Sequence, residues 1–378
     1  MERDQATKFL NDLLRLMTSR NGSDLFITAD FPPAIKVDGK VTKVSPQPLT
    51  AIHTMALARS VMNDRQIAEF ERTKEGNFAI SPPGIGRFRA NVFVQQGSVG
   101  MVLRVIPTAL PSLDRLGLPA CLKEIVLAKR GLCILVGSTG SGKSTSLAAM
   151  IDWRNEQSHG HIITIEDPIE FVHSHKNCIV TQREVGLDTE SWGAALRNTL
   201  RQAPDVIMMG ELRDRETMEH ALMFSETGHF CLATLHANSA NQALDRIINF
   251  FPEDRHAQLL MDLSLNLRAM ISQRLIVRQE GKGRVPAVEV LINSPLISDL
   301  IFKGAVTEIK EIMKKSSNIG MQTFDQSLYE LYENNVISYE DALRNADSLN
   351  DLRLQIKLNS RRGRASDLAA GTESLSFK

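Results

Sequence analysis

Short apolar runs alternate with helix-compatible stretches through the second third of the chain. Four of these runs contain no charged residue and have the length of a buried strand: residues 132–136, 162–165, 206–209 and 230–234. Strands covered on both faces show this continuous apolar pattern, and the stretches between them are long enough for covering helices. The pattern therefore predicts an α/β domain with a parallel sheet. Beyond Pro252 it predicts mostly helices.

The first hundred residues follow a different pattern, which predicts a small α+β domain. Helices are expected at residues 1–20, 51–63 and 66–72, and strands at 24–29, 34–37, 41–44, 76–80, 87–95 and 100–106. Asp38-Gly39 is typical of a tight turn between two of these strands. Prolines 107 and 111 then interrupt the pattern. We expect a first domain at 1–106, a linker at 107–117, a second domain at 118–346 and a partly disordered tail at 347–378.

Charge and composition exclude several classes of function. The 44 basic and 44 acidic residues balance, so no overall field attracts the chain to nucleic acid or to an anionic bilayer. Aromatic residues make up only 5%, without a basic stripe, which argues against a nucleic-acid translocase. No apolar run is long enough to span a membrane, so direct membrane insertion is not expected. The four widely spaced cysteines predict neither a disulfide framework nor a zinc site, and favour a cytoplasmic protein.

A glycine-rich loop directly follows the first apolar strand and precedes a helix-compatible run. It matches the pattern G-x-x-x-x-G-K-[ST] and predicts binding of ATP by Gly137, Ser138, Thr139, Gly140, Ser141, Gly142, Lys143, Ser144 and Thr145. Glycines let consecutive backbone N–H groups surround a phosphate, and the following helix directs its positive end at the same anion. Lys143 is expected to reach the β- and γ-phosphates. Ser144 is expected to bind Mg²⁺, which bridges them.

Carboxylates follow two of the other predicted strands. Residues 206–209 are followed by Gly210 and Glu211, and Glu211 is the first candidate for the general base, the alternative being an ordinary exposed loop glutamate. The segment after residues 162–165 holds Glu166, Asp167 and Glu170. It is either an exposed acidic turn or a group that orients water or Mg²⁺, with Glu170 the preferred catalytic participant and Glu166 and Asp167 the candidate metal ligands.

Two histidines lie at the two ends of the fourth apolar run. His236 follows its carboxyl end, where it could sense a γ-phosphate or a neighbouring subunit, and His229 precedes its amino end. Both are candidate catalytic residues, although a lone histidine is more often structural.

Taken in order, these motifs resemble the type II/IV secretion ATPase superfamily, most closely the PilT/PilU group of type IV pilus retraction ATPases. The resemblance rests on the loop 137–145, the acidic segments 165–171 and 209–214, and the histidine segment 228–236. It implies a PAS-like N-terminal domain, a RecA-like P-loop ATPase domain with a helical C-terminal part, and a hexameric ring. It also implies that arginines of the first domain reach the nucleotide. Arg89 and Arg104 match best, with Arg87 as an alternative, and an exposed structural arginine is the competing interpretation.

Two departures within this group favour its PilU branch. The segment 294–303 lacks the two arginines of the A-I-R-N-L-I-R-E motif typical of PilT, and the chain continues beyond residue 346. The resemblance then implies a bacterial motor for pilus retraction and twitching motility. Such a motor would lie peripherally at the inner membrane, with a PilT-type sister ATPase and a membrane platform protein as partners. The alternatives are a pilus-assembly or type II secretion ATPase, or an ATP-binding accessory subunit that is not itself the main motor.

Overall fold

The computed structural model describes residues 2–37, 39–107 and 110–362. Its contacts divide the chain into two compact units, one of Met1–Ala109 with Glu170–Val172 and one of Leu110–Ile169 with His173–Lys378. The division between residues 109 and 110 falls within the range 107–117 where a linker is predicted. Asp38 of the predicted turn and the end of the predicted tail, 363–378, lie outside the described residues. Within the described ranges, no helix is both long and apolar enough to cross a bilayer.

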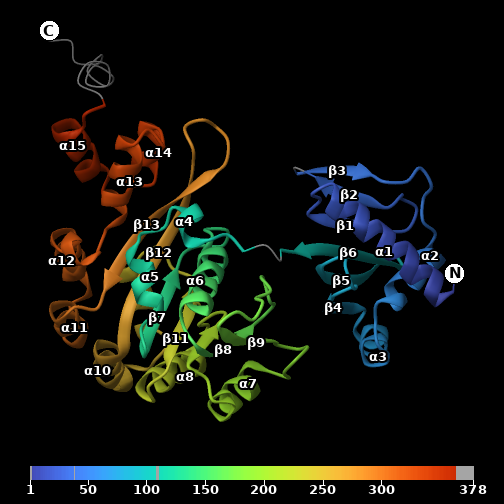
Figure 1. The fold of residues 1–378 in the computed structure, drawn as a ribbon, viewed down its shortest axis with the longest axis horizontal. Coiled ribbons are helices and arrows are strands. Elements are labelled where there is room, and N and C mark those ends of the chain that lie inside the picture. The colour runs from blue at the N-terminus through green and yellow to red at the C-terminus, as the bar shows by residue number, and fades with distance from the viewer. Residues whose placement is uncertain (1, 38, 108–109, 363–378) are drawn as a thin grey trace, which may run out of the picture. The chain divides into compact units, whose positions relative to one another are not determined.

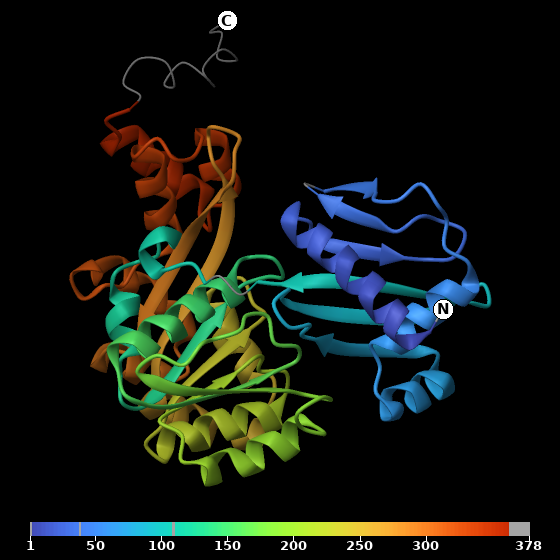
Figure 2. The ribbon, with the colours of Figure 1, turned by 45° about the vertical axis from the view of Figure 1, so that its right-hand side comes forward.

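The first unit is an antiparallel sheet with its strands in the order β3-β2-β1-β6-β5-β4. The strands are β1 (Asp24–Ile27), β2 (Ala34–Val37), β3 (Lys40–Lys43), β4 (Glu75–Ile80), β5 (Arg87–Gln95) and β6 (Ser98–Ile106), and the helices are α1 (Arg3–Ser19), α2 (Ala51–Ser60) and α3 (Asp64–Thr73). Leu10 and Leu14 of α1 and Leu57 of α2 share a buried core with alternate residues of β5. Figure 2 shows α1 crossing one face of the sheet. The helices and strands predicted for this unit are all confirmed.

The second unit contains a seven-stranded sheet in the order β13-β12-β7-β11-β10-β8-β9 (Figure 1). Its strands are β7 (Gly131–Val136), β8 (Gly160–Glu166), β9 (Cys178–Glu184), β10 (Val206–Met209), β11 (Phe230–Leu235), β12 (Leu267–Val277) and β13 (Arg284–Ile292). All neighbours pair in parallel except β12 with β13. The predicted parallel α/β sheet is therefore confirmed, with the four predicted strands at its centre.

Helices cover both faces of this sheet, as alternate residues of β7 show. Cys133 and Leu135 pack in one core with α6 (Lys143–Gln157), α4 (Leu113–Leu116) and α5 (Cys121–Val126). Leu132, Ile134 and Val136 pack in another core on the opposite face. The helices of that second core are α7 (Trp192–Thr199), α8 (Arg215–Glu226), α9 (Ala240–Ile248), α10 (His256–Asn266), α11 (Pro295–Phe302) and α12 (Ile309–Lys315). Successive strand side chains point to opposite faces, so one strand contributes to both cores.

The C-terminal helices pack on the outer part of β12 and β13. These helices are α13 (Phe324–Glu333), α14 (Tyr339–Arg344) and α15 (Leu349–Asn359). Leu352 and Ile356, one turn apart on α15, are buried against Phe324 and Leu328 of α13. Part of the predicted tail 347–378 is thus a packed helix, because this pair covers apolar surface of α13.

Three strands were missed by the prediction from the sequence. The region beyond Pro252 contains β12 and β13 as well as helices, and β9 lies at the sheet edge. Helix α10 ends at Asn266 and β12 begins at Leu267. No glycine or proline separates the two, so the hydrophobic pattern continues from one element into the next without a break signal.

Candidate functional site

Four parallel strands of the second unit end side by side at one edge of the sheet. In spatial order these are β7, β11, β10 and β8, and the segments that follow them carry Gly137, His236, Glu211 and Asp167. Backbone hydrogen bonds extend the pairing past the strand ends, from Gly137 N to Leu235 O at 3.2 Å and from Gly210 N to Ile165 O at 2.8 Å. The sheet therefore brings together residues from four separate parts of the sequence.

The loop between β7 and α6 has the backbone of a phosphate cradle. Gly140 and Gly142 have φ angles of +78° and +88°, which glycine adopts at little cost. Helix α6 begins at Lys143, so its unpaired N–H groups and positive dipole end face the loop. The Lys143 ammonium donates to Gly137 O at 2.7 Å and to Ser138 O at 2.9 Å. These bonds hold the cation on the loop where an anionic ligand would bind.

The electrostatics around Lys143 favour an incoming polyphosphate. Burial lowers the pKa of its ammonium, and the negative charge of Glu211 opposes that shift. A partly desolvated cation interacts more strongly with phosphate than a fully hydrated one does.

Gln273 of β12 supports the same loop from the sheet. Its Nε2 donates to Ser141 O at 2.8 Å, and its Oε1 accepts from Ser146 Oγ at 2.7 Å. In the described part of the chain, the buried Ser141 Oγ has no hydrogen-bond partner. The Ser141 hydroxyl is therefore available to donate a hydrogen bond to a ligand. A nucleotide phosphate, which has many acceptor oxygens, is such a ligand.

Replacement of Gly142 by alanine is expected to weaken ADP binding about tenfold or more. An added Cβ would lie 2.6 Å from Gln273 Nε2, at a φ that alanine adopts only under strain. Isothermal titration calorimetry with ADP measures the effect. Gly97→Ala is the matched control, because its φ of +76° is similar and an added Cβ would meet nothing within 4 Å. Equal affinities in both variants would contradict the assignment of this cradle.

Glu211 lies in a cluster of charged groups beyond β10. Its Oε2 is 3.2 Å from Arg213 Nε, and Arg213 Nη2 is 3.3 Å from Asp167 Oδ2. His236 Nε2 is 3.5 Å from the other oxygen of Glu211. A single guanidinium therefore bridges the carboxylates that follow β10 and β8, while the imidazole approaches Glu211 from β11.

The environment of His236 lowers the pKa of its imidazole, which favours the neutral form. Burial is the main cause of its lowered pKa, the Lys143 ammonium adds to the shift, and the charge of Glu211 opposes it. A neutral imidazole offers one donor and one acceptor, so His236 can bridge a carboxylate and a second polar group.

The carboxylates after β8 have different environments. Glu166 is buried and its Oε1 accepts from Thr164 Oγ1 at 2.6 Å and from Gln182 Nε2 at 3.1 Å. Asp167 is exposed and contacts Arg213. Glu170 is also exposed, and it belongs to the short segment that groups with the first unit.

Oxygen donors suited to Mg²⁺ lie at this edge of the sheet. The Ser144 hydroxyl is exposed in the first turn of α6, and the Asp167 carboxylate follows β8. Hydroxyl and carboxylate oxygens are the protein ligands that Mg²⁺ prefers. These residues fit the predicted metal, and the assignment of Ser144, Glu166 and Asp167 as its ligands stays a prediction.

The structure does not bring every predicted site residue to this edge. His229 precedes β11, at the end of the strand opposite to the loop 137–145. Its Nδ1 lies 3.0 Å from Thr227 Oγ1 and 3.2 Å from Phe224 O. Its catalytic role stays a prediction.

Arg89 and Arg104 lie in the first unit, directly opposite each other on β5 and β6. Arg104 also pairs in register with Asp24 of β1, and its Nε donates to Asp24 Oδ1 at 2.7 Å. Both arginine side chains are exposed on one face of the sheet. Burial tends to raise the pKa of Asp24, but the hydrogen bonds from Arg104 and Ser23 outweigh it and the pKa is lowered. The role of these arginines at a nucleotide stays a prediction.

Sequence reasoning missed two residues of the second unit that contact the candidate site. Arg213 lies within the acidic segment 209–214, but nothing in that segment predicts that its side chain contacts both Glu211 and Asp167. Gln273 lies on β12, a strand that the sequence pattern did not predict. Only the pairing of β12 with β7 places its amide against the phosphate loop.

Comparisons with known proteins agree with this geometry. The family model described as "Type II/IV secretion system protein" matches residues 2–358. The chain is 60% identical to the type IV pilus ATPase PilU of Pseudomonas aeruginosa, over 97% of this chain and 96% of that protein. It is 42% identical to PilT of the same organism, described as a type IV pilus retraction ATPase, over 89% of this chain and 98% of PilT.

Solved structures give the same result. A crystal structure of the pilus retraction motor PilT with bound ADP is 41% identical and superposes with a TM-score of 0.86, covering 91% of this chain and 98% of that one. The Legionella pneumophila ATPase DotB is 27% identical with a TM-score of 0.78, covering 88% of this chain and 94% of DotB. The fold is thus an N-terminal domain followed by a RecA-like ATPase domain. The chain belongs to the type II/IV secretion system protein family, and it is a nucleotide-binding ATPase of the PilT/PilU type.

Proposed function

We propose that this chain is an ATP-hydrolysing motor of type IV pilus retraction, acting as a homohexamer together with a PilT-type sister ATPase. The observation that supports the proposal most strongly is that Glu211 and His236 lie next to each other, 3.5 Å apart, beside the phosphate loop. The chain is also 60% identical to PilU over nearly its whole length.

In this proposal, residues 137–145 bind ATP and Lys143 neutralises charge on the β- and γ-phosphates. Glu211 accepts the proton of the attacking water, with Glu170 assisting, and His236 bridges Glu211 and the γ-phosphate. Arg89 and Arg104 add positive charge from the first unit. Ser144, with Asp167 and Glu166 as further candidate ligands, would hold Mg²⁺, which would supply positive charge that neutralises the phosphates.

Hydrolysis is converted to movement by closure between the two units about the linker 107–117. Rigid units joined by a short connection can turn a change in bound nucleotide into a change of angle. A ring of such subunits would act on a platform protein of the bacterial inner membrane, with the ATPase lying peripherally at the pilus base.

Deletion of this protein is expected to reduce twitching and leave excess unretracted pili, since disassembly of the fibre would slow. Complementation with the parent chain should restore retraction, whereas complementation with Lys143→Ala should not. Counting surface pili by electron microscopy and measuring twitching zones tests both statements. Bald cells after deletion would indicate an assembly ATPase. Restored twitching with Lys143→Ala would indicate an accessory subunit that is not the motor.

The same cells can test the sister ATPase. Strains that carry this protein alone, a PilT-type ATPase alone, or both should differ in retraction frequency, with the highest frequency when both are present. Equal frequencies with and without this protein would contradict a contribution to retraction.

A further inference from the structure

The loop 236–239, between β11 and α9, carries His236 and is held by bonds from three directions. Arg246 of α9 donates to His236 O at 2.7 Å. Arg274 of β12 donates to Asn238 O at 3.0 Å. Glu289 of β13 accepts from Ala240 N, directly after the loop, at 2.7 Å. Two of these three anchors come from β12 and β13, the long strands on which the C-terminal helices pack, so the loop is tied to a distant part of the second unit.

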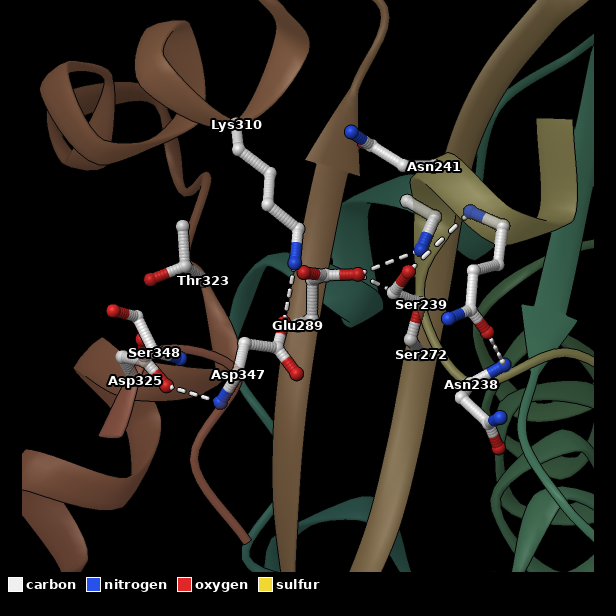
Figure 3. Close-up of polar contacts among 12 residues, drawn as sticks. Asn238, Ser239, Asn241, Ser272, Glu289, Lys310, Thr323, Asp325, Asp347 and Ser348 are labelled. Atoms are coloured by element: carbon white, nitrogen blue, oxygen red, sulfur yellow. Dashed lines mark hydrogen bonds and ion pairs between the residues drawn. The ribbon is translucent and has the colours of Figure 1, made fainter. Parts of the chain in front are cut away.

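Glu289 fixes the start of α9. Its Oε1 also accepts from Ser272 Oγ at 3.1 Å, and the whole side chain is buried. Figure 3 shows this carboxyl group between the start of α9 and the C-terminal residues Lys310 and Asp347. A carboxyl oxygen at the first N–H of a helix satisfies a donor that the helix itself cannot pair.

Arg274 connects the loop to the C-terminal helices directly. Its Nη1 donates to Asn345 O at 2.6 Å, and its Nη2 is 2.7 Å from Asp347 Oδ1. The guanidinium also lies over the ring of Phe324, the first residue of α13, at 4.0 Å from the ring centroid. A planar guanidinium can make these contacts at once because its donors are fixed in one fork.

Asp347 is itself held by residues of two helices, α13 and α12. It lies between α14 and α15, and its backbone N–H donates to Asp325 of α13 at 2.8 Å. Its second carboxylate oxygen forms an ion pair with Lys310 of α12. Figure 3 shows both contacts. A shift of the C-terminal helices would therefore move Asp347, and Arg274 with it.

We propose that Arg274 and Asp347 form a positioning pair through which the C-terminal helices set the place of the loop 236–239, and so of His236 opposite Glu211. Neither residue is catalytic, since each acts only through the loop. Gln273, the neighbour of Arg274 on β12, points to the other face and supports the phosphate loop. The pair is thus expected to affect hydrolysis and not nucleotide affinity. This inference rests on the role proposed above for His236 and Glu211.

The test is a double-mutant cycle in the full-length protein with Asp347→Asn, Arg274→Lys and both together. Each single variant is expected to lower kcat for ATP about three- to tenfold, while KM and the ADP affinity measured by calorimetry change less than about twofold. The double variant should be no slower than the slower single variant, because both changes break the same connection.

Asp351→Asn is the matched control. It removes one carboxylate from the same region, where Asp351 of α15 is 3.8 Å from Lys314, and it should leave kcat unchanged. Thermal unfolding of all four proteins shows whether they remain folded at the assay temperature.

Three outcomes would overturn the inference: multiplicative losses in the double variant, a loss of ADP affinity equal to the loss of kcat, or the same kcat in Asp347→Asn and Asp351→Asn. Failure of the proposed function is distinguishable, because it would leave Glu211→Gln as active as the parent chain whatever the cycle shows.

Discussion

Lys143→Ala is expected to lower ATP hydrolysis by at least about 10²-fold, which would leave turnover close to background. The Lys143 ammonium is the cation that the loop carbonyls of Gly137 and Ser138 hold beside the cradle. Without it, the charge that develops on the transferred γ-phosphoryl group loses its nearest positive partner. Phosphate release at saturating ATP and Mg²⁺ measures the effect, and calorimetry with ADP measures the accompanying loss of affinity.

Lys129→Ala is the control for this substitution. Lys129 is an exposed lysine shortly before β7, so the variant removes the same charge from the same unit without touching the loop. It should hydrolyse ATP at the parental rate. Parental activity in a folded Lys143→Ala protein would remove the basis for the assignment of the phosphate loop.

Glu211→Gln is expected to lower kcat by about 10²- to 10⁴-fold while retaining nucleotide binding. The amide keeps the shape of the side chain but cannot accept a proton from water at neutral pH. It also loses the charge that Arg213 Nε faces at 3.2 Å. Single-turnover hydrolysis and ADP titration of the same preparation separate the chemical step from binding.

Substitutions of two other glutamates show whether the loss of kcat is specific to Glu211. Glu219→Gln on α8 is the matched control, because Glu219 is exposed and contacts Arg215 one turn away. It should not change kcat. Glu170→Gln is expected to give a smaller loss than Glu211→Gln, as fits an assisting residue. A larger loss of kcat in Glu170→Gln than in Glu211→Gln would indicate that Glu170 is the general base and Glu211 the assisting residue.

The phosphate loop and the strand-end carboxylate were predictable because their signals are local in the sequence. Residues 137–145 contain the glycines and the lysine that the loop needs within one short motif. Residues 206–209 are apolar enough to identify a buried strand that ends shortly before Glu211. The first unit was predictable for a similar reason, since turn residues such as Asp38-Gly39 and Gly97 separate its predicted strands. β12 was not, because α10 continues directly into it.

The sequence by itself predicted a phosphate loop, two domains and acidic residues after two central strands, because each of these follows from a motif or from the apolar pattern over a few neighbouring residues. The tertiary structure alone decided that Arg213 joins Glu211 to Asp167, that Gln273 supports the phosphate loop, and that Arg274 reaches Asp347. These contacts depend on the order of strands in the sheet. Strand order is set by the packing of whole faces against each other, which no short stretch of sequence records.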